Sequence, residues 1–433
     1  MTSQNMNHSS LISVIIPVFD GGENFQRCID ALRACDPPPH EVIVVDDGST
    51  DESRRVANER GARVLMTDRP RSGPAMARNI GANAATGDVV LFIDADVAVQ
   101  PDVIGRIAHN FEADSDLAAC FGSYDEQPAA QNFLSQYKNL FHHYVHQSAQ
   151  ADASTFWAGC GAIRRDLFLK VGGFSETYPR PSIEDIELGY RLKAAGCKLQ
   201  LDKGIQCQHL KRWTWRSLLR SDILDRGMPW TELILRDGAF VNDLNLQTHN
   251  RISVVTVYLL LLSLAIGVLQ PIGWLASAGL AIILLRLNLK VYCFFKAQRG
   301  LFFTLRVVPT HWLYYVYNGI SFSIGAARHI FSADQSFERR KRWPLRVMIL
   351  VMFIGAALRF INLGRDSFWY DELLQVNIAA NHLPLLLSKM AENSAMPLDY
   401  LLTHGMLLLG RSEFWLRFPA AMWGLLTLPL MYQ

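Results

Sequence analysis

The chain has few cysteines for its length and almost no net charge. Seven cysteines occur among 433 residues, with no CxxC pair and no regular spacing. This argues against a disulfide framework and favours reduced thiols in a cytosolic domain with little metal bound to sulfur. The formal net charge is +2, so charge favours neither nucleic acid nor acidic partners. Residues 1–11 are polar, without an apolar core, and we expect no cleavable signal peptide.

Repeats and low-complexity tracts are also missing, but the composition changes sharply along the chain. Residues 1–250 alternate short apolar runs with helical patterns, which is typical of an α/β domain. Residues 251–433 contain long apolar runs. We therefore predict three regions: a soluble domain at 1–250, a membrane-associated region at 251–343 and a second membrane segment at 344–433.

Two acidic signatures follow apolar runs in the first region. Residues 42–45 lead into Asp46-Asp47-Gly48, and residues 89–93 lead into Asp94-Ala95-Asp96. Such runs are typical of buried parallel strands, and ligands bind where the carboxyl ends of these strands open. Two carboxylate clusters there are costly unless a cation lies between them. A hard divalent cation that carries a diphosphate fits best, which predicts a nucleotide-diphosphate substrate.

Each signature also has a simpler interpretation. The first is compatible with an ordinary turn and helix cap, and a lone DxD is common by chance. A third acidic element, Glu184-Asp185, begins an amphipathic helix. Interaction with the helix N-terminus, worth under about 1 kcal/mol, would explain it. The functional alternative is a general base that removes a proton from an acceptor hydroxyl.

Several segments occur together in an order that resembles a known family. They are SVIIPVFDGGENFQRCIDAL, VIVVDDGSTDES, RSGPAMARNIGA, VVLFIDADV, FWAGCGAIRRDLFLKVGGF and IEDIELGYRL. Residues 12–230 thereby resemble family 2 glycosyltransferases of the GT-A fold, of the bacterial membrane-associated kind. The resemblance implies a Rossmann-like, mostly parallel sheet, a nucleotide-diphospho-sugar donor, Mg²⁺ or Mn²⁺, and inversion at the sugar carbon.

The resemblance also implies roles for particular residues. The nucleotide and donor would be held by Pro17, Asp46, Asp47, Arg78 and Asp94, the metal by Asp94, Asp96 and His209, and catalysis would fall to Asp185 beside Glu184. Processive polysaccharide synthases carry a QxxRW element near His209-Leu210-Lys211-Arg212-Trp213. The match is partial, so Arg212 and Trp213 are candidates for donor contacts, beside the alternative of a basic helix facing anionic headgroups.

The apolar runs predict a multi-pass membrane protein. Residues 252–285, broken at Gln270-Pro271, are long enough for two spans of ~20 residues. Residues 307–327 lie between two basic loops, so we expect an interfacial or re-entrant helix with its tyrosines at headgroup level, while a true span stays open. Further apolar stretches lie at 345–361 and 414–430. The basic loops place the catalytic domain on the cytoplasmic side, in a bacterial inner membrane.

The segment 364–372 reads GRDSFWYDE and follows an apolar stretch. It resembles the first external loop of GT-C transferases that use polyprenyl phosphates, such as the protein mannosyltransferase and aminoarabinose transferase families. The resemblance makes Asp371 the candidate base of a second module; a short polar loop is the alternative. We expect 344–433 to be an incomplete module, because such enzymes need many more spans.

The sequence thus predicts a membrane-bound, metal-dependent inverting glycosyltransferase that moves a sugar from a nucleotide-diphosphate donor to a lipid (polyprenyl phosphate) or glycan acceptor. One alternative is a processive polysaccharide synthase. The other is a catalytically silent nucleotide-sugar-binding subunit of a membrane complex. The intact DxD and Glu-Asp elements argue against the silent subunit, because binding alone does not require Asp185.

Overall fold

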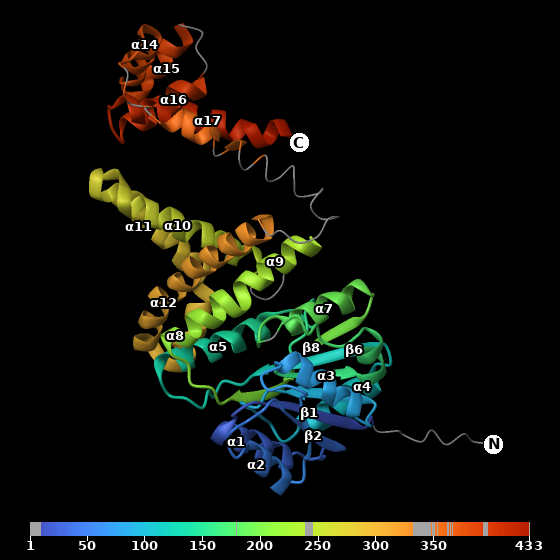
Figure 1. The fold of residues 1–433 in the computed structure, drawn as a ribbon. Helices are drawn as coiled ribbons and strands as arrows, with labels where there is room; N and C mark the ends of the chain where they lie inside the picture. The colour runs from blue at the N-terminus through green and yellow to red at the C-terminus, as the bar shows by residue number, and fades with distance from the viewer. Residues whose placement is uncertain are drawn as a thin grey trace, which may run out of the picture. The chain divides into compact units, whose positions relative to one another are not determined.

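The structure is a computed structural model (Figure 1). It describes residues 10–178, 180–238 and 246–331, and residues 348–432 except 349–350, 353, 362, 364, 366 and 393–396. The chain forms two compact units. The first contains residues up to Val255 together with Leu285–Ala326, and the second contains Thr256–Leu284 and the residues from Ala327 onward.

The first unit is built on one eight-stranded sheet with the order β3-β2-β1-β4-β7-β6-β8-β5. The strands are β1 Ile12–Val18, β2 Glu41–Asp46, β3 Arg63–Met66, β4 Val89–Ile93, β5 Val97–Val99, β6 Leu117–Tyr124, β7 Cys160–Arg164 and β8 Lys198–His209. Every residue of β4 and β6 is buried, so both faces of the sheet centre are covered. This explains the uninterrupted apolar runs.

The sheet is mixed, which corrects the prediction of a mostly parallel sheet. Strands β3, β2, β1 and β4 run parallel, and β6 is parallel to β8. The β4–β7, β7–β6 and β8–β5 pairs are antiparallel. An apolar run predicts that a strand is buried but not its direction, because distant partners in the sheet fix that direction.

The helices of the α/β part connect and cover these strands. They are α1 Gly22–Arg33, α2 Ser53–Glu59, α3 Pro74–Ala84, α4 Val103–Ala113, α5 Phe133–Ser148, α6 Arg165–Lys170, α7 Glu184–Ala194, α8 Trp215–Leu219, the π-helix η1 Arg220–Gly227 and α9 Met228–Asp237. Asp51 accepts a hydrogen bond from the Ser53 amide at 3.0 Å and another from the Gly22 amide at 2.8 Å. It therefore joins the starts of α1 and α2.

Parallel pairing brings the two acidic signatures to one edge of the sheet. β1 lies between β2 and β4, with Val18 opposite Asp46 and Ile15 opposite Phe92. Because the three strands are parallel, the strand that ends at Asp46 and the strand that precedes Asp94 open at the same edge of the sheet, where their carboxyl ends lie. The predicted topology of the acidic signatures is therefore present in the sheet.

The apolar helices are α10 Thr248–Leu269, α11 Ile272–Leu287 and α12 Leu289–Phe331. In the described part of the chain, the segment Thr248–Val268 is the one helix that is long and apolar enough by itself to cross a bilayer; α11 and α12 qualify only as a pair bent by 65°. The turn at Gln270-Pro271 lies where the sequence predicts it. The helix α12 is broken at Gly300, where φ is +80°.

The tyrosines of 307–327 are buried in the first unit, which differs from the predicted position at headgroup level. The Tyr315 hydroxyl donates to Asn288 Oδ1 at 2.6 Å, and the Tyr317 hydroxyl donates to Asp222 Oδ2 at 2.8 Å. His311, fully buried, contacts Tyr137 of α5 through its Nδ1 at 3.0 Å. These internal hydrogen bonds satisfy the polar groups, which therefore need no interface.

The second unit contains the remaining helices, α14 Tyr370–Ala379, α15 Leu383–Glu392, α16 Pro397–Leu407 and α17 Glu413–Tyr432. A small apolar cluster of Ile378, Leu386 and Met390, with Tyr400 against it, joins α14, α15 and α16. Within the predicted apolar stretch at 345–361, the described residues 354–360 are helical, while residues 332–347 of the basic loop before it lie outside the described residues.

Candidate active site

The loop after β2 is held together by its own acidic residues. The buried Asp46 carboxylate accepts the Ser49 amide at 2.9 Å through Oδ1, and its Oδ2 lies 3.1 Å from Arg54 Nε. Gly48 has a φ of +91°, and a Cβ there would lie 2.6 Å from Pro70 Cβ. Only glycine fits this approach, which explains the Asp-Asp-Gly sequence.

Asp47 shapes the neighbouring loop. Its carboxylate accepts hydrogen bonds from the Thr67 hydroxyl, the Ser72 amide and the Gly73 amide, each at 2.8 Å. Both oxygens are used, so Asp47 fixes the loop that leads into α3. Pro17, the other residue predicted nearby, lies in β1 opposite Val45.

Arg78 of α3 joins the second and third acidic elements. Its Nη2 lies 2.6 Å from Asp94 Oδ1 and its Nη1 lies 2.9 Å from Glu184 Oε1. Arg78 and Glu184 are both almost fully buried. Burial disfavours the arginine charge, but the charges of Asp94 and Glu184 outweigh this effect and raise the pKa of Arg78. The geometry therefore brings together three predicted residues that are distant in sequence.

Asp94 and Asp96 have opposite pKa shifts. Burial, together with the charge of Asp96, raises the pKa of Asp94 in spite of Arg78. Burial also penalises the ionised form of Asp96, but His209 and Lys211 outweigh it and lower the Asp96 pKa. The His209 Nε2 lies 3.5 Å from Asp96 Oδ2. Asp96 is thus the carboxylate that stays ionised most readily and faces the positive side of the cluster.

His209 is held rigidly beside Asp96. Its Nδ1 lies 2.7 Å from Asn139 Oδ1, and its ring stacks on Tyr124 with centroids 4.4 Å apart and planes 6° apart. If Asn139 accepts from the Nδ1–H, the Nε2 of a neutral imidazole is left with a lone pair toward Asp96. In that tautomer the second ring nitrogen is free to coordinate a cation.

Asp185 lies in the first turn of α7, close to the same cluster. Its carboxylate accepts the Ala158 amide at 3.2 Å and the Ile186 amide at 2.8 Å. Burial and the charge of Glu184 raise the pKa of Asp185 to about 6, against the opposing charges of Arg226 and Arg78. A carboxylate with a pKa just below neutrality combines ionisation at pH 7 with appreciable proton affinity, as a general base requires.

The side chains of the cluster provide some, but not all, of the ligands that a hard cation needs. Asp94 and Asp96 supply carboxylate oxygens, and Mg²⁺ is commonly bound by one or two carboxylates plus substrate phosphates. No group of three His, Cys, Asp or Glu side chains that could hold a metal by themselves occurs among the residues described in the structure. A cation here would therefore need ligands from the substrate.

Comparison with known proteins identifies the domain. Residues 13–172 match the family model described as Glycosyl transferase family 2. This part of the chain is thus similar to family 2 glycosyltransferases, and it is called the family 2 domain below. The match covers β1 to α6, including both acidic signatures and Arg78, while Asp185 and His209 lie beyond it.

Curated relatives of the family 2 domain include transferases. The chain is 35% identical over 119 residues to the glycosyltransferase YibD of Escherichia coli, covering 27% of this chain and 35% of that protein. It is 28% identical over 240 residues to validoxylamine A glucosyltransferase of Streptomyces hygroscopicus, covering 47% of this chain and 53% of that protein. The chain thus spans about a third to a half of the length of these relatives.

A solved mannosyltransferase from Pyrobaculum calidifontis, in complex with GDP-Man and Mn²⁺, aligns with 76% of this chain and 89% of its own. The sequence identity is 15% and the TM-score is 0.47. At this sequence identity and TM-score, the similarity to family 2 depends on the family model and the sequence relatives and not on this structure.

Arg226 is a residue of the cluster that sequence reasoning misses. It lies in the π-helix η1, is exposed, and its charge lowers the pKa of Asp185. Nearby protein atoms partly desolvate the Arg226 charge, but the charges of Asp185, Tyr124 and Asp222 outweigh this effect and raise the pKa of Arg226. Arg226 follows Asp185 by 41 positions in the sequence, and the only local signal is the π-helix, a feature often found at functional sites.

The two candidate residues of the partial QxxRW match differ in exposure, because Trp213 is buried and Arg212 is exposed. The Trp213 ring is buried, with Lys211 Nζ 4.5 Å from the ring centroid, and its backbone amide donates to Ser135 Oγ at 2.7 Å. Arg212 is exposed in the segment before α8. Trp213 therefore anchors this segment to α5, and the surface offered to a ligand here is basic.

The histidines of α5 pack beside the cluster. Two of them are satisfied: His143 Nδ1 lies 2.6 Å from the Tyr124 carbonyl oxygen and His146 Nδ1 lies 3.1 Å from the Gly122 carbonyl oxygen. His142 packs 4.4 Å from the Tyr124 ring, and its buried Nδ1 lacks a hydrogen-bond partner in the described structure. These contacts pack α5 against β6.

The second candidate base, Asp371, lies in the second unit. It occupies the first turn of α14 and is exposed. Its neighbour Glu372 is engaged by Arg417 at 2.7 Å and accepts the Trp369 amide at 3.0 Å. The hydrogen bond from Arg417 lowers the pKa of Glu372. Of the acidic pair, Asp371 is the member that faces solvent.

Proposed function

We propose that this chain is a metal-dependent inverting glycosyltransferase that uses a nucleotide-diphosphate sugar. The observation that carries the proposal is the convergence of Asp94, Glu184 and Asp185 around Arg78, with Asp96 beside Asp94, in the part of the chain that resembles family 2. Such a carboxylate cluster is costly to maintain without a cationic ligand. A ligand that brings a cation and a diphosphate would offset this cost.

Asp94 and Asp96 would hold Mg²⁺ or Mn²⁺, with His209 as a further ligand. A bound cation of this kind would neutralise charge on the departing diphosphate. Arg78 would keep Asp94 oriented, because it binds one oxygen of that carboxylate. Arg226, Lys211 and Arg212 would add positive charge around the diphosphate.

Asp185 would act as the base in a single displacement. An acceptor oxygen forms a bond to the sugar C1, the bond from C1 to the diphosphate oxygen breaks, and the acceptor proton passes to Asp185. The nucleoside diphosphate leaves with the bonding electrons. One displacement inverts the configuration at C1, and a pKa of about 6 leaves Asp185 ionised and ready to accept a proton at neutral pH.

The acceptor is proposed to be a membrane lipid, a polyprenyl phosphate, or a glycan. The apolar helices that follow the family 2 domain support a membrane location, with α10 as the strongest candidate span. Basic residues before α10, among them Arg216 and Arg220, suit a cytoplasmic membrane surface. In this proposal the catalytic domain faces the cytoplasm of a bacterial cell.

The second unit would belong to a GT-C-type module with Asp371 as its base. In this proposal the family 2 domain would charge a polyprenyl phosphate, and the second module would use that lipid-linked sugar on the far side of the membrane. This hypothesis fails if the chain transfers sugar to soluble or polysaccharide acceptors and never to polyprenyl phosphate.

An Asp185→Asn variant separates the enzyme from a silent nucleotide-sugar-binding subunit. In the enzyme, nucleotide affinity should be largely retained while transfer falls by about 10²–10⁴-fold. The chain should be assayed in membranes with a panel of nucleotide sugars and polyprenyl phosphate. Unchanged product formation would contradict the role of Asp185, and a polymer as product would favour the processive synthase.

A further inference from the structure

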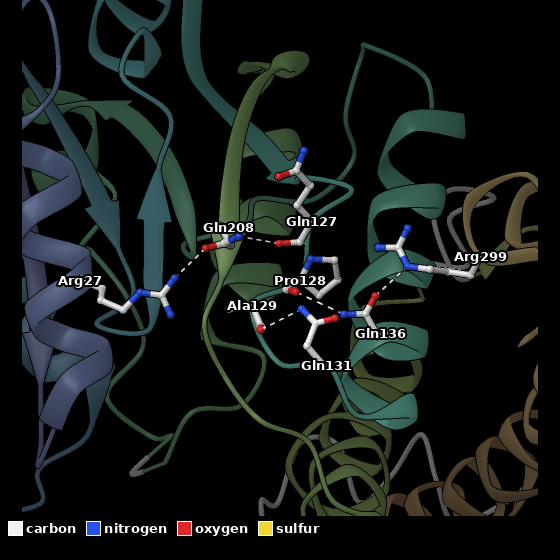
Figure 2. Close-up of a pocket in the computed structure, with 8 residues that line it drawn as sticks. All are labelled: Arg27, Gln127, Pro128, Ala129, Gln131, Gln136, Gln208 and Arg299. Atoms are coloured by element: carbon white, nitrogen blue, oxygen red, sulfur yellow. Dashed lines mark hydrogen bonds between the residues drawn. The ribbon is translucent and has the colours of Figure 1, made fainter.

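A second polar pocket lies apart from the carboxylate cluster. It lies between α1, the loop from β6 to α5 and the end of the first segment of α12, just before the break at Gly300, and has a volume of about 410 Å³ (Figure 2). Its polar side chains are Arg27, Gln127, Gln131, Gln136, Gln208 and Arg299. The volume lies within the range of small-molecule sites in proteins.

This pocket is on the opposite face of β8 from the candidate active site. His209 and Gln208 are neighbours on β8, and adjacent strand residues point to opposite faces. His209 approaches Asp96, whereas Gln208 accepts a hydrogen bond from Arg27 Nη2 at 2.9 Å and donates to the Gln127 carbonyl at 2.6 Å. The function proposed above uses none of these pocket residues.

Two positively charged side chains of the pocket, Arg27 and Arg299, have only neutral hydrogen-bond partners. Arg299 donates from Nε to Gln136 Oε1 at 2.8 Å and from Nη2 to the Glu126 carbonyl at 2.9 Å. The Glu126 carboxylate instead lies 3.3 Å from His143 Nε2. Throughout the described part of the chain, neither Arg27 nor Arg299 has a carboxylate within ion-pairing distance. An anion would supply the missing charge.

The amides between the two arginines are already oriented by hydrogen bonds. Gln136 donates to the Pro128 and Ala130 carbonyls at 3.2 and 2.9 Å, and Gln131 donates to the Ala129 carbonyl at 3.3 Å (Figure 2). Gln136 thereby uses both N–H groups of its amide, so the donors left for a ligand are the remaining N–H groups of the two arginines, and arginine forks recognise phosphate oxygens. The chemistry of the pocket therefore fits a phosphate group.

The chain continues from this pocket directly onto exposed apolar surface. Arg299 precedes the break at Gly300, and Leu301, Phe302 and Leu305 follow it with exposed fractions of 54%, 85% and 58%. Side chains this apolar and this exposed mark contact with a membrane or an apolar partner. A soluble phosphate compound would make no use of them.

We propose that this pocket binds the headgroup phosphate of an anionic membrane phospholipid, with the lipid chains lying against Leu301, Phe302 and Leu305. The site is separate from the carboxylate cluster, so the proposal does not depend on the sugar or on the acceptor. It would fix the family 2 domain against the membrane surface at a defined place, through α1 and α12 together.

The test uses the full chain in nanodiscs with a photoreactive phosphatidylglycerol whose diazirine lies near the headgroup. We expect cross-linked peptides from 127–136 and 299–305. Unlabelled phosphatidylglycerol should compete, phosphatidylcholine should compete poorly, and glycerol 3-phosphate should compete weakly because it lacks acyl chains. Glycerol 3-phosphate that competes as well as the phospholipid would overturn the assignment to a lipid.

Substitutions distinguish the pocket from general surface charge. Arg27→Gln and Arg299→Gln should each reduce labelling roughly fivefold, the effect of one basic residue near an anionic surface. Lys296→Gln removes the same charge from an exposed position on α12 outside the pocket and should leave labelling nearly unchanged. Arg27 is exposed and makes one hydrogen bond to a side chain, so its variant should fold. Equal loss in the Lys296 variant, or no loss in the Arg27 variant, would refute the site.

Discussion

Replacing Asp185 by asparagine should stabilise the fold while it removes transfer activity. Folding raises the pKa of Asp185 from its ordinary 3.8 to about 6, mainly through burial and the charge of Glu184. A carboxyl group whose pKa is raised by folding favours the folded state while it is protonated. This contribution to stability is lost as the pH rises through about 6, the pKa in the folded state. At pH 7.5 the ionised side chain therefore costs stability.

The size of the effect follows from the shift and from one lost hydrogen bond. A shift of about two pKa units corresponds to about 3 kcal/mol. Asparagine keeps one acceptor oxygen, so one of the bonds from Ala158 and Ile186 is lost, at a cost of about 1 kcal/mol. The net gain of about 2 kcal/mol predicts a melting temperature roughly 4–8 °C higher for a domain of this size.

The assay is thermal unfolding of the purified chain, followed by tryptophan fluorescence from pH 5 to pH 8. The difference between variant and parent should be largest at pH 8 and shrink below pH 6. Glu187→Gln is a matched control on α7, because it removes an equal charge that is paired with Arg191 at 2.9 Å. That control should lower the melting temperature. An Asp185 variant that is less stable at every pH would refute the reasoning.

Three further predictions follow from the cluster. Arg78→Leu should cost about 3–5 kcal/mol of stability, because it leaves the buried Glu184 and the half-buried Asp94 without their charge partner; an unchanged melting temperature would contradict this. Asp96→Ala should abolish metal-dependent binding of nucleoside diphosphates in calorimetry, and binding that still responds to Mn²⁺ would exclude Asp96 as a ligand. Arg226→Gln should move the acid limb of the pH–rate profile, expected near pH 6, to higher pH, whereas Arg216→Gln should leave it in place.

Local sequence patterns predicted the parts of the site that depend on residues close together in the sequence. Apolar runs closed by acidic turns predicted β2 and β4 and the edge at which Asp46 and Asp94 lie. These features depend on residues within one strand and one turn.

Features that depend on distant contacts were not predicted. The antiparallel direction of β7 is fixed by its neighbours β4 and β6, which are far from it in the sequence. The proximity of Arg226 to Asp185 depends on how η1 packs near the start of α7, where the Ser182 hydroxyl donates to the Asp225 carbonyl. The tyrosines of α12 carry an interfacial pattern, yet Tyr317 is buried because Asp222 and Lys138 form a polar network around it. A sequence pattern does not contain such pairings.

The central claim is that the carboxylate cluster transfers a sugar from a nucleotide-diphosphate donor with a metal. The most direct measurement is nucleoside diphosphate release by membranes that contain the full chain, across a panel of nucleotide sugars. Each donor is offered with and without Mn²⁺ or Mg²⁺ and polyprenyl phosphate, beside the Asp96→Ala variant. The account predicts release from one donor that requires metal and acceptor and disappears in the variant. Nucleotide binding without release from any donor would contradict it.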